Sequence, residues 1–235
     1  MNHCKEQHLT VAGIPARSGS KRLKNKNIRK LNGVPLIAYS IRFAKSLPGI
    51  DRVVVNTDSP EYAAIAREYG AETPFLRPKE SSTDTASLGD TMAQVCDYFH
   101  REEETHIAKY VTLLPTSIFR NREMLTDALN AADEYRLVAS VKEVDFSPNR
   151  YGVPMDGQLV PLGPMIKKPF EEGCYTKGVG LFSIQGVDIM PLKRQKLYKI
   201  RSVYELIDID TEDDFKLAET VLREGLYDFG VDLGL

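Results

Sequence analysis

Residues 9–30 read LTVAGIPARSGSKRLKNKNIRK, and this stretch decides which fold the chain can adopt. Its first part, residues 9–15, is largely apolar and ends in proline, which predicts a buried strand. Residues 17–30 contain seven basic side chains and no acidic one. The helical spacing of apolar residues then predicts a helix at 35–47. A strand that leads through a basic, glycine-containing loop into a helix is an arrangement that binds phosphate groups at the edge of a parallel sheet.

The positive charge of this loop needs an explanation, because the rest of the chain is acidic. The protein has 235 residues and a formal charge of −2, so the residues outside the loop sum to −9. Cations packed this densely repel one another unless an anion lies among them. Backbone N–H groups of residues 18–20 would help to bind such an anion. The side chains that would supply fixed charge are Arg17, Lys21 and Lys26. The alternative is a solvated basic loop.

The remainder of the chain alternates between short apolar runs and amphipathic segments. We expect strands at 52–57, 75–76, 110–114, 137–144, 179–184, 196–200 and 205–210. We expect helices at 60–69, 88–103, 122–134 and 212–224. Strands that alternate with helices of this length are typical of βαβ units. The sequence therefore predicts an α/β fold in which a mostly parallel, Rossmann-like sheet is flanked by helices.

The alternation stops at about residues 145–178. Proline and glycine are frequent there, and residues 155–158 read MDGQ, which is typical of a hairpin turn. We interpret this segment as a β-rich insertion that acts as a lid or a dimer contact. Residues 1–235 are otherwise expected to form a single domain.

Composition argues against several classes of protein. Apolar residues make up 42% and charged residues 27%, as in an ordinary water-soluble domain. No apolar run reaches the roughly 18 residues that cross a bilayer, and we expect no signal peptide at residues 1–10. The three cysteines lack metal-ligand spacing, which favours reduced thiols and a cytoplasmic location. The glycine patterns of P-loop ATPases and nicotinamide-binding domains are both missing after the first strand.

A second candidate site lies near the end of the chain, where Asp208 and Asp210 alternate with Ile207 and Ile209. On a strand, residues i and i+2 point to one face, so the two carboxylates would stand side by side about 6–7 Å apart. Adjacent carboxylates repel unless a cation lies beside them. Mg²⁺ suits this position, because it is commonly held by one or two carboxylates and substrate phosphates. The alternative is that both aspartates only precede and cap the last helix.

Residues 14–28, IPARSGSKRLKNKNI, resemble the signature loop of the acylneuraminate cytidylyltransferases, the CMP-sialic acid synthetase family. Three further segments occur in the family's order: LRPKESSTDTAS at 76–87, PTS at 115–117 and IDIDTE at 207–212. The resemblance implies transfer of CMP from CTP to the anomeric hydroxyl of a nonulosonic (nine-carbon 2-keto-3-deoxy) sugar acid, with release of pyrophosphate. It also implies a Mg²⁺ cofactor and a homodimer.

The resemblance assigns roles to individual residues. The catalytic residues would be Arg17, Lys21 and Asp210. The metal ligands would be Asp208 and Asp210. The nucleotide would be bound by Ala16, Arg17, Ser20, Lys21, Lys26, Asn27, Arg77 and Ala86, with Arg77 and the backbone near Ala86 reading the cytosine. The sugar acid would lie near Leu114, Thr116, Ser117 and Gly180. Lys167 or Lys168 would approach the sugar carboxylate bound by a partner subunit, unless both lie on a solvated surface.

Several positions around the expected sugar site depart from the family's usual residues. Leu114 stands where members commonly have glutamine, and residues 118–120 read IFR where they often have PLR. Val179 replaces a polar residue such as asparagine, and Leu88 replaces serine. A site without these polar groups disfavours N-acetylneuraminate, because the sugar's hydroxyls would lack partners. We therefore expect a modified nonulosonate such as legionaminate or pseudaminate.

Two other functions stay open at this point. An enzyme of the same fold could act on another sugar acid such as Kdo, although the Kdo enzymes usually lack the KNI ending of the loop at 26–28. A nucleic-acid-binding protein could use the basic loop instead. However, one short cationic loop on an acidic chain is a small electrostatic footprint, and no aromatic platform accompanies it. We therefore expect no nucleic-acid partner and no membrane partner.

Overall fold

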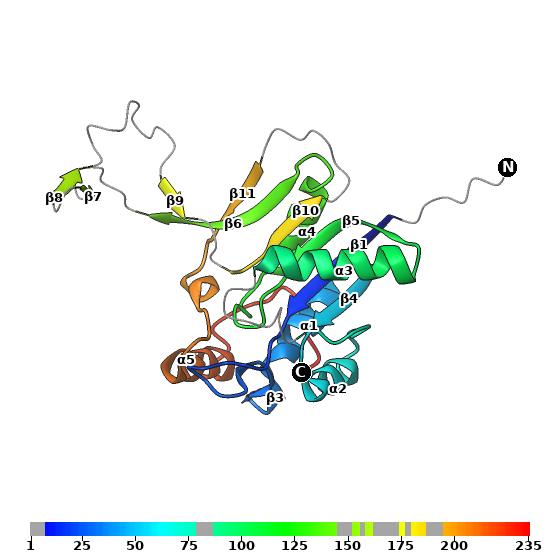
Figure 1. Ribbon diagram of the computed structural model, residues 1–235. Coiled ribbons are helices and arrows are strands. Elements are labelled where there is room, and N and C mark those ends of the chain that lie inside the picture. The colour runs from blue at the N-terminus through cyan, green and yellow to red at the C-terminus, as the bar shows by residue number, and fades with distance from the viewer. Residues whose placement is uncertain are drawn as a thin grey trace.

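The computed structural model describes residues 8–78, 87–144, 152–155, 158–161, 174–176, 180–186 and 195–235. Within these ranges a seven-stranded sheet has the order β11-β6-β10-β5-β1-β4, with β9 beside β6 (Figure 1). Its strands are β1 (His8–Pro15), β4 (Arg52–Asn56), β5 (His106–Thr112), β6 (Leu137–Val144), β9 (Cys174–Thr176), β10 (Ser183–Gly186) and β11 (Gln195–Lys199). β4, β1, β5, β6 and β11 run in one direction, whereas β10 and β9 run in the other. The predicted mostly parallel α/β sheet is confirmed.

Helices cover both faces of this sheet. They are α1 (Leu36–Ser46), α2 (Pro60–Glu68), α3 (Leu88–Glu102), α4 (Arg122–Ala131) and α5 (Glu212–Arg223). Val11 of β1 packs with Phe99 of α3 in one core cluster, whereas Ile14 belongs to a cluster that includes Ile41 of α1 and Leu125 of α4. Figure 1 accordingly shows α3 in front of the sheet. Successive side chains of a strand point to opposite faces, so the two clusters follow from the apolar runs in the sequence.

The helix starts follow local capping chemistry. Ser59 Oγ accepts a hydrogen bond from Tyr62 N at the start of α2. Thr211 and Asp214 form a capping box at the start of α5. Such caps satisfy backbone N–H groups that have no partner within the helix.

Gly13 is required by a close contact inside the sheet. A Cβ atom at this position would lie 1.8 Å from Oη of Tyr110, which is buried on the neighbouring strand β5. Any larger residue would therefore displace the Tyr110 ring, which packs in the cluster beneath α3.

Two predicted strands are wrong. Residues 75–76 form no strand; nearby, only Glu72 makes an isolated bridge, to Val54. Residues 205–210 form no strand either. A short 3-10 helix, η5 (Val203–Leu206), is capped by Ser202 and takes up the first two of these residues, and residues 207–210 belong to no helix or strand. A capping box between Ser202 and Glu205 satisfies the backbone of η5 locally. An extended backbone becomes a strand only where a neighbour offers a hydrogen-bonding ladder, and the sequence does not reveal that neighbour.

The described part of the insertion contains the predicted hairpin. Strand β7 (Gly152–Met155) pairs antiparallel with β8 (Gln158–Pro161), and Met155 faces Gln158. The hairpin stands apart from the main sheet at the left of Figure 1. Ala86, Lys167, Lys168 and Val179 lie outside the described residues.

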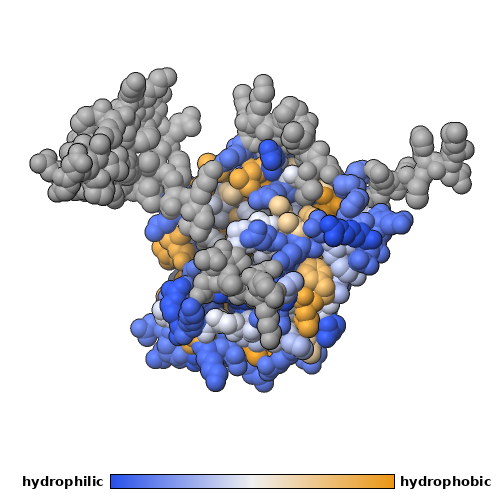
Figure 2. All heavy atoms as spheres, viewed as in Figure 1, coloured by the Kyte–Doolittle hydropathy of each residue, from blue (hydrophilic) through white to orange (hydrophobic). Residues whose placement is uncertain are grey.

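Hydrophilic and hydrophobic side chains both reach the surface of the described residues. On the face shown in Figure 2, hydrophobic residues form separate patches within a mainly hydrophilic surface. In the ranges that the structure describes, none of the helices has both the length and the hydropathy needed to span a bilayer.

Candidate active site

A cavity of about 590 Å³ lies at the carboxyl ends of β1 and β5. Nine residues that line it were predicted to bind nucleotide, metal or sugar: Arg17, Ser20, Lys21, Lys26, Asn27, Arg77, Leu114, Thr116 and Asp210. The other lining residues are Pro15, Arg22, Leu23, Leu88 and Thr91. Leu88 among them stands at a position that departs from the family's usual residue. The cavity therefore brings together all four motif segments, at 14–28, 76–87, 115–117 and 207–212.

Hydrogen bonds from neighbouring segments fix the backbone of the basic loop. Ala16 N donates to Asn56 O at 2.9 Å, and Ala16 itself is fully buried beneath the loop. Ser18 donates from both its backbone N and its Oγ to the carboxylate of Asp58, each at 2.8 Å. Asn27 Nδ2 donates to Arg17 O at 3.1 Å, which ties the far end of the loop to its beginning. The loop is thus shaped before any ligand is present.

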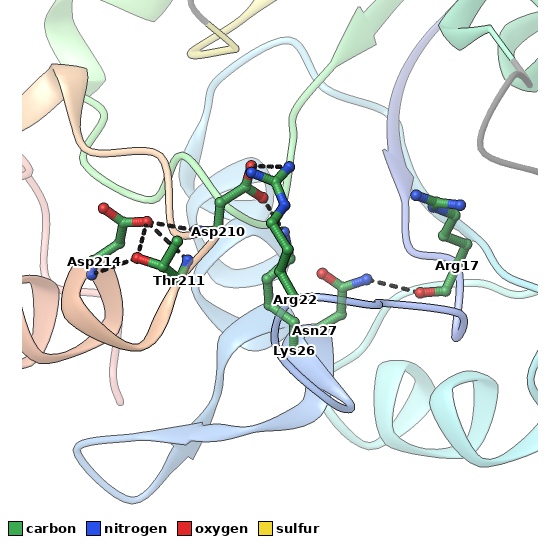
Figure 3. Close-up of polar contacts among 7 residues, drawn as sticks. All are labelled: Arg17, Arg22, Lys26, Asn27, Asp210, Thr211 and Asp214. Carbon is green, nitrogen blue, oxygen red and sulfur yellow. Dashed lines mark hydrogen bonds and ion pairs between the residues drawn. The ribbon is translucent and has the colours of Figure 1, made fainter.

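Asp210 faces two cations of this loop. Lys26 Nζ lies 2.5 Å from Asp210 Oδ1, and Arg22 Nη2 lies 2.6 Å from Asp210 Oδ2 (Figure 3). The Arg22 side chain is 70% exposed, whereas those of Lys26 and Asp210 are 14% and 29% exposed. Arg17 lies on the other side of Asn27 in Figure 3 and lines the same cavity. A carboxylate and several cations therefore meet where an anionic ligand and a metal would meet.

The start of α5 holds Asp210 in place. Asp210 N donates to Asp214 Oδ2 at 3.1 Å, and Thr211 donates to the same oxygen from its backbone N at 2.8 Å. Burial raises the pKa of Asp214, but the hydrogen bonds from Thr211 and from Asp210 N outweigh it, so the pKa lies below the usual value of 3.8. The ionised Asp214 therefore acts as an anchor for the segment that carries Asp210.

A second link joins α5 to the end of the basic loop. Arg29 donates two hydrogen bonds to Glu212, at 2.5 and 2.7 Å, and its guanidinium lies 4.2 Å from the centre of the Phe215 ring. Planar arginine forks match a carboxylate in this bidentate way. The pair sets the beginning of α5 against the loop and so helps to place Asp210 over the cavity.

Arg77 joins β4 and α3 at the cavity. Its Nε donates to Asn56 Oδ1 at 2.7 Å and its Nη2 to Thr91 Oγ1 at 2.7 Å. Its backbone N donates to Thr57 O at 2.8 Å. The side chain is buried, and burial lowers the pKa of Arg77. The predicted contact of Arg77 with cytosine stays a prediction, supported by its place in the lining.

A smaller cavity of about 120 Å³ adjoins the first one and shares Leu88 and Leu114 with it. Its other lining residues are Thr112, Ala139, Ser140, Gly180, Phe182 and Ser183. Three of the predicted sugar-site residues therefore line one cavity or both: Leu114, Thr116 and Gly180. The fourth, Ser117, lines neither; it is buried, and its Oγ has no hydrogen-bond partner among the described residues.

Gly180 packs closely against the loop at 114–117, on the other side of the smaller cavity. Its φ is +75°, and a Cβ atom there would lie 2.8 Å from Ser117 Oγ. Thr116 O accepts a hydrogen bond from Ile209 N at 2.9 Å, which joins the 115–117 loop to the segment of Asp210. The predicted sugar residues are therefore physically continuous with the phosphate side of the site.

The structure places the two aspartates differently with respect to the cavity. Residues 207–210 are not part of a strand, and Ile209 between the two aspartates is buried as expected. Asp208 is exposed and does not line the cavity, whereas Asp210 does. Within the described ranges no group of three or more His, Cys, Asp or Glu side chains is placed to hold a metal. Asp210 fits a Mg²⁺ site that takes one carboxylate from the protein and further oxygens from phosphates and water.

Comparison with known proteins gives the same family as the sequence motifs. A family model described as Cytidylyltransferase matches residues 11–147. The chain is 31% identical over 226 residues to the CMP-N,N'-diacetyllegionaminic acid synthase of Legionella pneumophila, covering 91% of this chain and 96% of that one. It is 37% identical over 225 residues to the N-acylneuraminate cytidylyltransferase of Escherichia coli, covering 91% of this chain and 52% of that protein.

A solved structure has the same fold. The CMP:2-keto-3-deoxy-manno-octonic acid synthetase complexed with CTP matches with a TM-score of 0.66 at 16% identity, covering 92% of this chain and 99% of that one. At this level of identity, the match concerns the arrangement of the helices and strands.

Proposed function

The chain belongs to the cytidylyltransferase family, and from this premise we propose that it transfers CMP from CTP to the anomeric hydroxyl of a nonulosonic sugar acid and releases pyrophosphate. The observation that carries the proposal is the cavity in which Arg17, Lys21 and Lys26 meet Asp210. These groups are the ones that a metal-bound triphosphate needs, and each comes from a segment that matches the family's motifs.

The proposed chemistry is an in-line attack on the α-phosphorus of CTP. Negative charge grows on the phosphate oxygens and then on the departing pyrophosphate. Arg17, Lys21 and Lys26 would bind these oxygens, and their charge stabilises the transition state more than the ground state. Because neighbouring hydrogen bonds already shape the loop, little reorganisation is needed at the moment of reaction.

We assign the metal to Asp210. When bound, Mg²⁺ would neutralise phosphate charge and orient the reacting oxygens. Lys26 and Arg22, which pair with Asp210 here, also line the cavity that the phosphates would enter. Asp208 as a second ligand stays a prediction, because its exposed side chain lies outside the cavity lining. No histidine lines the cavity within the described residues, so we assign no histidine general base.

The smaller cavity favours a substrate with apolar substituents. Leu88, Leu114 and Phe182 present apolar side chains there, beside the hydroxyl groups of Thr112, Ser140 and Ser183. A diacylamino nonulosonate carries a second acylamino group in place of one hydroxyl of sialic acid and a terminal methyl in place of the hydroxymethyl group, and both changes suit such a lining. We therefore propose a legionaminate- or pseudaminate-type acid as the substrate. The diacetyllegionaminic acid synthase among the relatives supports this choice.

The test is a pyrophosphate-release assay with CTP, Mg²⁺ and four acids: diacetyllegionaminate, pseudaminate, N-acetylneuraminate and Kdo. We expect turnover with one of the first two and much weaker turnover with the others. A thermal-shift comparison of CTP with UTP, GTP and ATP checks the nucleotide. Folded protein that releases no pyrophosphate with any nonulosonate, or that prefers Kdo, would contradict the proposal.

We also propose that the protein works as a cytoplasmic homodimer and that the β7–β8 hairpin contributes to the dimer contact. The separation of the hairpin from the main sheet supports this use (Figure 1). Light scattering on the full chain and on a variant lacking residues 152–161 would measure it. A wild-type monomer at assay concentration would contradict the proposal.

A further inference from the structure

Arg120 is a charged side chain with no solvent exposure, at the end of the loop that follows β5. Its guanidinium donates three hydrogen bonds to neutral partners. Nε donates to Leu181 O at 2.6 Å, and Nη2 donates to Leu114 O at 2.5 Å. Nη1 donates to Ser40 Oγ at 3.0 Å. Two carbonyl groups and a hydroxyl therefore accept its hydrogen bonds, and Asp208 is near enough to contribute an opposing charge.

A buried cation of this kind is costly. Moving a charged group out of water carries a penalty of several kcal/mol even after the structure relaxes, and carbonyl dipoles recover only part of it. Burial lowers the pKa of Arg120 to about 9, which reflects the same penalty. A leucine or methionine would fill the core without this cost. The guanidinium therefore has a role that apolar packing cannot replace.

The segments that Arg120 joins are the two walls of the smaller cavity. Leu114 lines both cavities. Leu181 directly follows Gly180. Gly180 lines the smaller cavity and packs against the loop that contains Leu114 and Ser117. The two segments belong to the loop after β5 and the loop before β10, and those strands run antiparallel. Arg120 thus crosses from one wall to the other, behind the surface that faces the ligand.

Two further contacts make this bridge specific. Ser40 of α1 also donates from its Oγ to Leu114 O, at 3.3 Å, so it binds both Arg120 and the carbonyl that Arg120 holds. Gly180 leaves no room for a Cβ against Ser117, so the loops are already in van der Waals contact. A small shift of either loop would therefore change the width of the cavity.

We propose that Arg120 is a positioning residue that sets the spacing between Leu114 and Leu181 and thereby shapes the subsite for the sugar acid. It does not touch the substrate; it acts through the two carbonyl groups that it holds. The inference rests on the proposed function. Only a planar fork with several donors can hold both carbonyl groups and Ser40 together, and the single ammonium group of a lysine cannot match that geometry.

The test compares Arg120→Lys with Arg122→Lys. Arg122 is a matched control, because its Nε also donates to a backbone carbonyl, Ser46 O at 3.0 Å, and it lines neither cavity. We expect Arg120→Lys to raise the KM for the sugar acid about tenfold, as the loss of one hydrogen bond to a charged group would, while the KM for CTP stays near the wild-type value. Arg122→Lys should change neither KM.

Ser40→Ala provides a milder second variant, because it removes one partner of Arg120 and leaves the charge in place. We expect it to raise the KM for the sugar acid in the same direction but by less. If Arg120→Lys fails to fold, Ser40→Ala decides the matter. Equal changes in both KM values, or no change in either for Ser40→Ala, would overturn the inference.

The outcome can be separated from a failure of the proposed function. A wild-type protein that is inactive with every nonulosonate defeats the proposed function. An active wild-type protein whose variants show no preferential effect on the sugar acid defeats only the role of Arg120. A thermal shift with CTP, measured on each variant, checks independently that the nucleotide side is intact.

Discussion

The ammonium group of Lys26 lies 2.5 Å from the carboxylate of Asp210, although 184 positions separate them in sequence. The basic loop after β1 and the segment before α5 therefore build one site. Arg17 lines the same cavity. The contact also means that a metal or a phosphate entering the site would exchange with existing ion pairs rather than meet isolated charges.

Replacement of Arg17 should remove most turnover. Arg17→Ala takes away a cation that the proposed reaction needs at the phosphates, so we expect kcat to fall by about 10²–10³. The melting temperature should stay near that of the wild type, because the side chain lines a cavity rather than the core. Lys24→Ala is the control from the same loop, exposed and absent from the lining. A similar loss for Lys24→Ala would show that only the overall charge of the loop matters.

Asp210 and Asp208 should differ sharply in their importance. Asp210→Asn keeps the shape of the side chain and removes the charge that would bind Mg²⁺, so kcat should fall by about 10²–10³ at any Mg²⁺ concentration. The kcat of Asp208→Asn should fall far less, because Asp208 is exposed and outside the cavity lining. Steady-state assays across a Mg²⁺ titration measure both variants. Equal losses would restore Asp208 as a metal ligand.

Gly180→Ala should harm both stability and sugar binding. A non-glycine residue at φ +75° costs about 1–3 kcal/mol, and the added Cβ would press on Ser117 Oγ. Gly225→Ala is a matched control with φ +62° and no atom within 4 Å of the added Cβ. We expect urea denaturation to show a lower free energy of unfolding for both variants. The KM for the sugar acid should rise only for Gly180→Ala. A rise of this KM in both variants would show that reduced stability, rather than the shape of the sugar subsite, raises it.

Acid should weaken the anchor at the start of α5. The pKa of Asp214 is lower in the folded protein than its usual value of 3.8, so its ionised form contributes stability above pH 3.8. That contribution is lost as the pH falls through the lower folded pKa. The difference in melting temperature between wild type and Asp214→Asn should therefore be largest near neutral pH and should shrink below pH 4. A difference in melting temperature that stays the same from pH 7 to pH 3 would contradict the prediction.

The parts of the fold that were predicted correctly depend on local chemistry. The apolar runs of β1, β4 and β6 and the capping residues Ser59 and Thr211 leave clear signals in the sequence, because neighbouring residues determine them. The two wrong strands, at 75–76 and 205–210, depend on whether a distant segment offers a ladder. Extended stretches without such a neighbour look identical in sequence to strands.

The candidate site was predicted where motifs mark it and missed where tertiary packing decides. The basic loop and Asp210 were found because charge and pattern single them out. Arg22 was counted as one of the loop's charges, but only the structure pairs it with Asp210. Arg120 gave no signal of its burial, because a sequence shows a charge but not the carbonyl groups that will surround it.

The reversed direction of β10 has a consequence for redesign. Because this strand leaves the edge where the parallel strands end, the loop at 180–182 reaches that edge from a different part of the chain than the basic loop. Gly180, Phe182 and Ser183 line the smaller cavity and not the larger one. Substitutions in this segment would therefore alter the proposed sugar subsite while leaving the lining of the proposed nucleotide site unchanged.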